Sequence, residues 1–275
     1  MTILTDCHTH LDHFPPSEIP EVLQRARDAG VGLIVSAGTT LDSSKACVEL
    51  ANTHRMLYAG VGIHPMDLGG PIDNPTYTSL IDMVAGNPKV VCISEIGLDF
   101  LPTSPDHQIQ FQAFHRQIGL ARELNKPVIV HSRDSHPDLL RILRTEKARD
   151  VGGIMHYFQG SEKVANEAID LGFFISLAKP LLRLPELQDL ARNLPLKRIV
   201  LETDSAPQPW KKYRRNWTEP SHVRQVAEKL ADIKELTVEE VIQLTTDNLL
   251  EILNLTVDMV DQPGLIKPYF HSSSK

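Results

Sequence analysis

The 275-residue sequence has few cysteines and no long apolar run. Its three cysteines, Cys7, Cys47 and Cys92, are too few for a disulfide framework, which favours a reducing compartment. No segment approaches the roughly 18 consecutive apolar residues of a membrane helix. The first residues also lack the basic and then apolar layout of a signal peptide. We therefore expect an intracellular protein, cytoplasmic or nuclear, that does not interact with a membrane.

An excess of positive charge is missing as well. The formal net charge is −7, so the overall composition does not indicate a nucleic-acid-binding protein. The one obvious basic patch is Lys211-Lys212-Tyr213-Arg214-Arg215, which lies between Trp210 and Trp217. This segment is either a clamp for a DNA strand, with an aromatic ring available for base stacking, or a solvated loop.

What the chain does contain is a regular alternation of short apolar runs and amphipathic helical segments. About eight strands, each followed by a helix, predict a single-domain (β/α)8 TIM barrel over residues 1–257, with a C-terminal tail at 258–275. The expected strands are 3–9, 32–37, 57–62, 89–94, 128–130, 153–155, 173–177 and 198–201. The expected helices are 17–30, capped by Ser17, then 42–53, 77–85, 105–124, 138–146, 162–171, 184–193, 221–230 and 238–253.

Histidines and acids follow the predicted strands. In a barrel the carboxyl ends of all strands surround one pocket, so these side chains are expected to converge. Along the first strand, alternation places Asp6, His8 and His10 on one face and turns Cys7 toward the helices as a buried, inert thiol. Imidazole is a common metal ligand, so the convergence predicts a metal centre. The converging set is His8, His10, His64, Glu95, His131, His156 and Asp204.

The number of candidate ligands exceeds what one ion uses. Four imidazoles and two carboxylates suit two divalent ions about 3.5–4 Å apart, with Glu95 as the natural bridge. The ligand types leave the identity of the ions open. Zinc, magnesium and manganese are the candidates, and iron and cobalt are also compatible.

Six motifs in order resemble the TatD-type metal-dependent deoxyribonucleases, whose fold is similar to the amidohydrolase barrels. The resemblance extends from Asp6 to Leu253. The motifs are Asp-x-His-x-His-Leu-Asp at 6–12, Gly-Ile-His-Pro at 62–65, Glu-Ile-Gly-Leu-Asp at 95–99, His-Ser-Arg-Asp at 131–134, His-Tyr-Phe-x-Gly at 156–160 and Glu-Thr-Asp-Ser at 202–205.

The resemblance implies a role for each matching residue. His64 would contact a substrate phosphate, and Glu202 would either orient a metal ligand or point outward to a helix. Arg133 and Lys179 would each contact a phosphate or form a surface ion pair. Segment 176–180 departs from the family, where a small residue or Gly is expected, so the pocket floor would differ there. The first ion would be held by His8, His10 and Asp204, the second by His131 and His156, and Glu95 would bridge them.

The resemblance also implies a nuclease that removes nucleotides from a DNA 3′ end or nicks DNA at damaged sites. Our hypothesis is that activated water attacks phosphorus in line, with Asp204 as ligand and proton acceptor and Glu95 as the bridging catalytic carboxylate. The first alternative is an amidohydrolase or lactonase acting on a small cyclic substrate, and the second is a non-enzymatic metal- and phosphate-binding scaffold. DNA is the expected partner, no obligate protein partner is expected, and a monomer is the default.

Overall fold

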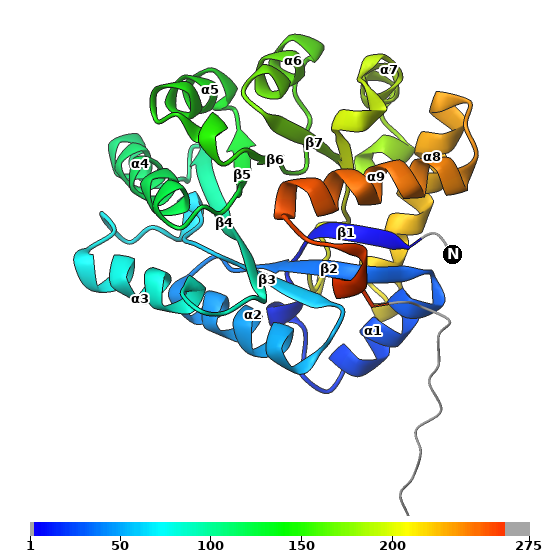
Figure 1. Ribbon diagram of the computed structural model, residues 1–275, viewed down its shortest axis with the longest axis horizontal. Helices are drawn as coiled ribbons and strands as arrows, with labels where there is room; N and C mark the ends of the chain where they lie inside the picture. Colours follow the sequence, from blue (N-terminus) through cyan, green and yellow to red (C-terminus); the bar gives the residue numbers. More distant parts are fainter. Residues whose placement is uncertain (1–2, 262–275) are drawn as a thin grey trace, which may run out of the picture.

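The computed structural model describes residues 3–261, in which eight parallel strands form one sheet ordered β1 to β8 (Figure 1). The (β/α)8 prediction is confirmed. The strands are β1 (Leu4–Thr9), β2 (Val31–Ala37), β3 (Leu57–Val61), β4 (Val90–Asp99), β5 (Val128–Arg133), β6 (Gly153–Met155), β7 (Phe173–Leu177) and β8 (Ile199–Leu201).

Helices surround the strands in chain order (Figure 1). They are α1 (Ile19–Asp28), α2 (Leu41–Thr53), α3 (Asn74–Val84), α4 (His107–Glu123), α5 (His136–Thr145), α6 (Glu162–Asp170), α7 (Pro185–Asn193), α8 (Val223–Lys234) and α9 (Val238–Leu253). In the described part of the chain, no helix is long and apolar enough to cross a membrane.

The ring closes where the first and last strands meet at their carboxyl ends. The His10 N–H donates to the Ser205 carbonyl over 2.8 Å, and the Asp204 N–H donates to the His8 carbonyl over 3.0 Å. Thr9 and Ser205 also form a parallel bridge. Closure therefore brings His8 of β1, and His10 just after the strand, beside Asp204, almost 200 residues later in the chain.

The opposite end of the barrel is covered by α9. Leu249, Leu250 and Leu253 of this helix pack with apolar side chains from inside the barrel. Near the starts of the strands, Thr246 Oγ1 donates to the Ile3 carbonyl over 2.6 Å, and Asn248 Nδ2 donates to the Ile199 carbonyl over 2.7 Å. Within residues 3–261, α9 therefore covers this end of the barrel and leaves the carboxyl end for the site predicted from the sequence.

One prediction for β1 is wrong. Cys7 is fully buried inside the barrel and not against the helices, and its Sγ lies 3.2 Å from Ser176 Oγ. The reason is a register shift. Three steps of β1, from Asp6 to Thr9, pair with two steps of β2, so Cys7 and His8 both turn inward. Asp6 instead accepts a hydrogen bond from Thr203 Oγ1 over 2.6 Å.

Several element boundaries also differ from those expected. Helix α1 begins at Ile19, after Glu18, so Ser17 is not its N-cap. Helix α3 begins three residues early, because the Asp73 carboxylate accepts from the Thr76 N–H over 2.8 Å.

The first residues of the expected tail pack against the barrel. Val260 is buried, and the Asp261 N–H donates to the Gly32 carbonyl over 3.0 Å. Asp261 also pairs with Arg27, with 3.2 Å between Nε and Oδ2. The rest of the expected tail, 262–275, lies outside the described residues.

Candidate metal centre

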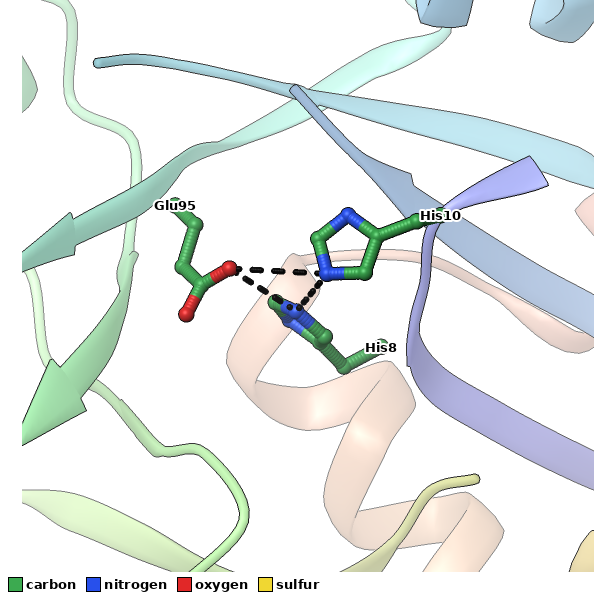
Figure 2. Close-up of side chains that lie close together, drawn as sticks. All are labelled: His8, His10 and Glu95. Carbon is green, nitrogen blue, oxygen red and sulfur yellow. Dashed lines mark hydrogen bonds and ion pairs between the residues drawn. The ribbon is translucent and has the colours of Figure 1, made fainter. Parts of the chain in front are cut away.

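Two imidazoles and a carboxylate meet at the end of β1. The Nε2 atoms of His8 and His10 are 3.3 Å apart, and Glu95 Oε2 lies 3.3 Å from the first and 3.6 Å from the second (Figure 2). His10 Nδ1 lies 3.1 Å from the Ala37 carbonyl, so the hydrogen on Nδ1 donates there and the Nε2 lone pair faces the centre. Lone pairs this close repel one another unless a proton or a metal ion lies between them.

The second carboxylate oxygen of Glu95 faces other histidines. Oε1 lies 3.1 Å from His131 Nδ1 and 3.2 Å from His156 Nε2. Glu95 is buried and belongs to β4, between the strands that carry these two groups of imidazoles. Each oxygen of one carboxylate thus has its own set of histidines, which is the arrangement a bridging ligand needs.

Asp204 lies on the open side of the cluster. Its Oδ1 is 3.4 Å from His10 Nε2 and 4.0 Å from His8 Nε2, and 32% of its side chain is exposed. Its φ of 51° is left-handed, a conformation that costs free energy in a non-glycine residue and is typical of functional sites. Asp204 is therefore the carboxylate of this cluster that solvent or a ligand can reach.

Two further carboxylates hold the histidines from behind. Asp99 Oδ2 lies 2.8 Å from His131 Nε2, and Glu202 Oε1 lies 3.0 Å from His156 Nδ1. In each case the carboxylate lies beside the ring nitrogen that faces away from Glu95. For His131 this contact is a hydrogen bond, so its other nitrogen presents a lone pair to the centre.

Glu202 points into the barrel, and the outward alternative is wrong. It is fully buried, accepts from the Tyr157 N–H over 2.8 Å and accepts from Ser176 Oγ over 2.6 Å. Asp99 received no role from the sequence. The available signal was its spacing of four residues from Glu95, which places both on one face of an extended strand.

The electrostatics of the cluster favour positive charge at its centre. Burial alone would lower the pKa of His10, but Asp204 and Glu95 outweigh it and raise the pKa to about 9. Burial would also lower the pKa of His156. The carboxylates of Glu202 and Glu95 outweigh this effect and raise the pKa of His156 well above its usual value. The buried Glu95 has its pKa held well below its usual range by the surrounding imidazoles. Protons or metal ions at the centre would supply this positive charge equally well.

His64 lies near the cluster but differs in its hydrogen bonding. Its Nε2 is 3.5 Å from Glu95 Oε1, while its Nδ1 accepts a hydrogen bond from the Met66 N–H over 3.1 Å. A neutral imidazole whose Nδ1 accepts carries its proton on Nε2. That nitrogen is then a hydrogen-bond donor toward Glu95 Oε1, which distinguishes it from the ring nitrogens that present lone pairs, although its distance alone would allow coordination.

The two predicted rim cations have different surroundings. Arg133 is half-exposed, and its Nε lies 3.8 Å from Asp99 Oδ2, a long ion pair. Lys179 is partly buried, and its Nζ lies 3.5 Å from His222 Nδ1. Among residues 3–261, no carboxylate oxygen lies within 4.0 Å of Lys179 Nζ, so the interpretation of Lys179 as a surface ion pair is wrong.

The residues present fit divalent cations. Three groups each bring their ligand atoms within 4.8 Å of one another: His8–His10–Glu95, His8–His156–Asp204 and His64–Glu95–His131. Imidazole nitrogens and carboxylate oxygens are the usual ligands of zinc and manganese, so these groups fit such ions.

Comparison with known proteins gives one consistent result. Residues 5–254 match the family model described as TatD related DNase. The metal-dependent hydrolase YabD of Bacillus subtilis is 34% identical over 90% of this chain and 97% of its own length. The human deoxyribonuclease TATDN3 is 33% identical over 90% of this chain and 94% of its own. The 3′-5′ ssDNA/RNA exonuclease TatD of Klebsiella pneumoniae is 36% identical over 67% of this chain and 71% of its own.

Solved structures agree with the sequence comparison. The crystal structure of the TatD homolog YJJV from Escherichia coli superposes with a TM-score of 0.81 at 28% identity, and the match covers 92% of this chain and 98% of that one.

Proposed function

The chain belongs to the TatD-related DNase family of metal-dependent hydrolases, and from that premise we propose that it is a deoxyribonuclease that hydrolyses DNA phosphodiester bonds at a two-metal centre. The observation that carries the proposal is Glu95, whose two carboxylate oxygens each face separate histidines. Family relatives described as a deoxyribonuclease and as a 3′-5′ exonuclease support DNA as the substrate and removal of nucleotides from its 3′ end. Nicking at damaged sites is the second mode of the same proposal.

Each ion has a proposed set of ligands. His8, His10 and Asp204 would hold the first ion, His131 and His156 would hold the second, and Glu95 would be shared between them. When bound, such ions lower the pKa of water toward about 7 and neutralise phosphoryl oxygens. Zinc, magnesium and manganese remain the candidates.

The chain itself supplies the proton acceptor and the substrate contacts. Burial would raise the pKa of Asp204, but its contact with His10 and the other imidazoles lowers it, so Asp204 is ionised at neutral pH and accepts the proton of the attacking water. The Nε2–H of His64 donates to a phosphoryl oxygen in the pocket. Arg133 and Lys179 contact phosphates at the rim.

The test replaces Asp204 with Asn and measures two reactions, cleavage of a DNA oligonucleotide and opening of a small lactone. We expect DNA cleavage by the wild type, and a loss of roughly 100-fold or more in the variant with its thermal melting unchanged. The matched control is Asp28→Asn at the exposed end of α1, where full activity is expected. Lactone opening without DNA cleavage would replace the nuclease by the amidohydrolase or lactonase alternative, and near wild-type rates in Asp204→Asn would contradict its role.

Location and assembly are also part of the proposal. All three cysteines are free and buried, which supports a reducing intracellular compartment, cytoplasmic or nuclear. A monomer without an obligate protein partner stays a prediction.

A further inference from the structure

Residues 210–217, here called the 210–217 loop, form the basic segment beside the candidate site. Some of its residues anchor the loop to the barrel, and others face solvent. Arg214 Nε lies 2.6 Å from Glu18 Oε2, and its Nη1 lies 2.8 Å from Glu219 Oε1. The same guanidinium lies 4.5 Å from the ring of Trp217 and 5.5 Å from the ring of Phe14. These contacts fix the middle of the loop against the barrel.

Other residues of the loop face solvent. Trp210 is 76% exposed and Tyr213 is 45% exposed. The cations of Lys212 and Arg215 lie 5.2 and 4.7 Å from the Tyr213 ring. Among the described residues neither cation has a carboxylate within 4.0 Å. Two exposed aromatic rings and two unpaired cations on one anchored loop have no structural role in the barrel, and such a patch marks an interaction site.

The loop borders the candidate metal centre. It follows Ser205, which pairs with Thr9 where the barrel closes, and its anchor Phe14 lies just after His10. The loop therefore lies at the carboxyl end of the barrel, beside the edge formed by β1 and β8.

Positive charge continues from the loop to the rim of the pocket. Lys179 Nζ lies 3.5 Å from His222 Nδ1, and Lys211 adds a further positive charge that lowers the pKa of both groups, after the larger effect of burial. Lys211 Nζ itself donates to the Asn216 carbonyl over 2.9 Å, which places this cation within the anchored part of the loop. Cations thus line a path from β7 to the exposed aromatic rings.

From this arrangement we propose that the 210–217 loop is a binding platform for single-stranded nucleic acid, in which Trp210 and Tyr213 stack on unpaired bases while Lys212 and Arg215 hold the backbone phosphates. Arg214 acts only as the positioning residue. Exposed rings and cations on one loop complement the bases and phosphates of a single strand, and a base offers its face only when it is unpaired. This proposal rests on the proposed function in one respect, that the bound strand leads into the site where it would be cleaved.

Binding is measured without catalysis. Protein held in a chelator is titrated into a fluorescently labelled 20-nucleotide thymidine strand, and anisotropy gives the dissociation constant at several salt concentrations. We expect Trp210→Ala to weaken binding by about 5-fold or more, the low end of what one stacked base contributes. For Lys212→Ala/Arg215→Ala we expect the slope of log affinity against log salt to fall by about 1.4, since each lost phosphate contact removes about 0.7.

The matched control removes the same charge elsewhere. Arg141→Ala/Arg192→Ala deletes two exposed arginines on the outer helices α5 and α7, and we expect an unchanged slope. Thermal melting of every variant shows that each is folded. The two tryptophans give a second readout. Quenching of tryptophan fluorescence by the strand should disappear in Trp210→Phe, because Trp217 is packed against Arg214.

The outcomes separate this inference from the proposed function. Wild type that binds and cleaves DNA, with loop variants that bind equally well, overturns the platform and leaves the nuclease intact. Equal binding of a blunt duplex and of the single strand also overturns it, because a duplex offers no free base faces along its length. Protein that binds the strand through the loop but cleaves no DNA with any metal overturns the proposed function and leaves the platform standing.

Discussion

Replacing Asp99 with Asn should weaken one metal ion selectively. In the wild type, Asp99 Oδ1 accepts from the Leu101 N–H over 3.0 Å, while Oδ2 lies 2.8 Å from His131 Nε2. Both contacts need an acceptor, and Asn has only one side-chain oxygen. If the oxygen stays with Leu101, the amide N–H₂ faces His131 Nε2 and forces the ring proton onto Nδ1. That nitrogen lies 3.1 Å from Glu95 Oε1, on the side of the centre, so a protonated Nδ1 cannot bind a metal ion.

The magnitude follows from the hydrogen bonds. The other orientation of the Asn amide keeps the correct His131 tautomer but sets two donors against each other at Leu101. The first orientation keeps both hydrogen bonds but leaves the proton on the metal-facing nitrogen, so metal binding needs the second orientation, which loses one buried hydrogen bond at a cost of about 1–3 kcal/mol. Because 1.4 kcal/mol corresponds to a factor of ten, the ion beside His131 should bind roughly 10- to 100-fold more weakly.

The assay is a chelator competition titration of metal-stripped protein. Wild type should bind two equivalents of a divalent ion such as zinc, and Asp99→Asn should weaken one equivalent while leaving the other within about twofold. Asp28→Asn serves as the control for loss of one carboxylate far from the site. Unchanged affinity of both equivalents in folded Asp99→Asn would refute the argument that Asp99 sets the tautomer of His131.

Three further predictions follow from the same contacts. Gly97→Ala should lower the melting temperature by roughly 6 °C or more, because Gly97 has a φ of +144° and an added Cβ would lie 2.0 Å from the His131 carbonyl oxygen. A variant that melts at the wild-type temperature would contradict this steric argument. Removal of divalent ions with a chelator should lower the melting temperature, and an ion at 100 times its dissociation constant should restore about 2.7 kcal/mol of stability; calorimetry that shows no shift would exclude the ion as a ligand of the folded state. His64→Ala should lower kcat/KM by about 10-fold or more, the effect of losing one hydrogen bond to a charged phosphate, with bound metal unchanged in elemental analysis; loss of an equivalent of metal would instead make His64 a ligand.

The sequence predicted the barrel and the set of converging side chains, because both depend on local patterns. Each apolar run has the length of a strand, and parallel strands present their carboxyl ends at one rim whatever their separation in sequence. His8 and Asp204 could therefore be placed together without any knowledge of the contacts between their strands. The structure brings His8 Nε2 within 3.3 Å of Glu95 Oε2 and within 4.0 Å of Asp204 Oδ1, while the roles assigned to these residues stay predictions.

The remaining features depend on register and on tertiary contacts, which a single sequence does not show. Strict alternation in β1 put Cys7 on the helical side, and the register shift between Asp6 and Thr9 reversed it. Strand β4 continues through Glu95 to Asp99 because its pairing with β5 extends that far, so Asp99 was not recognised as a partner of His131.

The basic loop shows the same limit. Composition could not distinguish Arg214, which is partly buried and contacts two glutamates and two aromatic rings, from Lys212 and Arg215, which face solvent.

Cleavage of end-labelled single-stranded DNA by metal-stripped protein tests the central claim most directly. Magnesium, manganese and zinc are added back separately, with a Glu95→Gln variant in parallel. The account predicts a ladder that shortens from the 3′ end with at least one ion and is absent in the variant, because an amide cannot present two anionic oxygens to two ions. No cleavage with any ion, in protein shown to hold metal, would contradict the claim that this centre hydrolyses DNA.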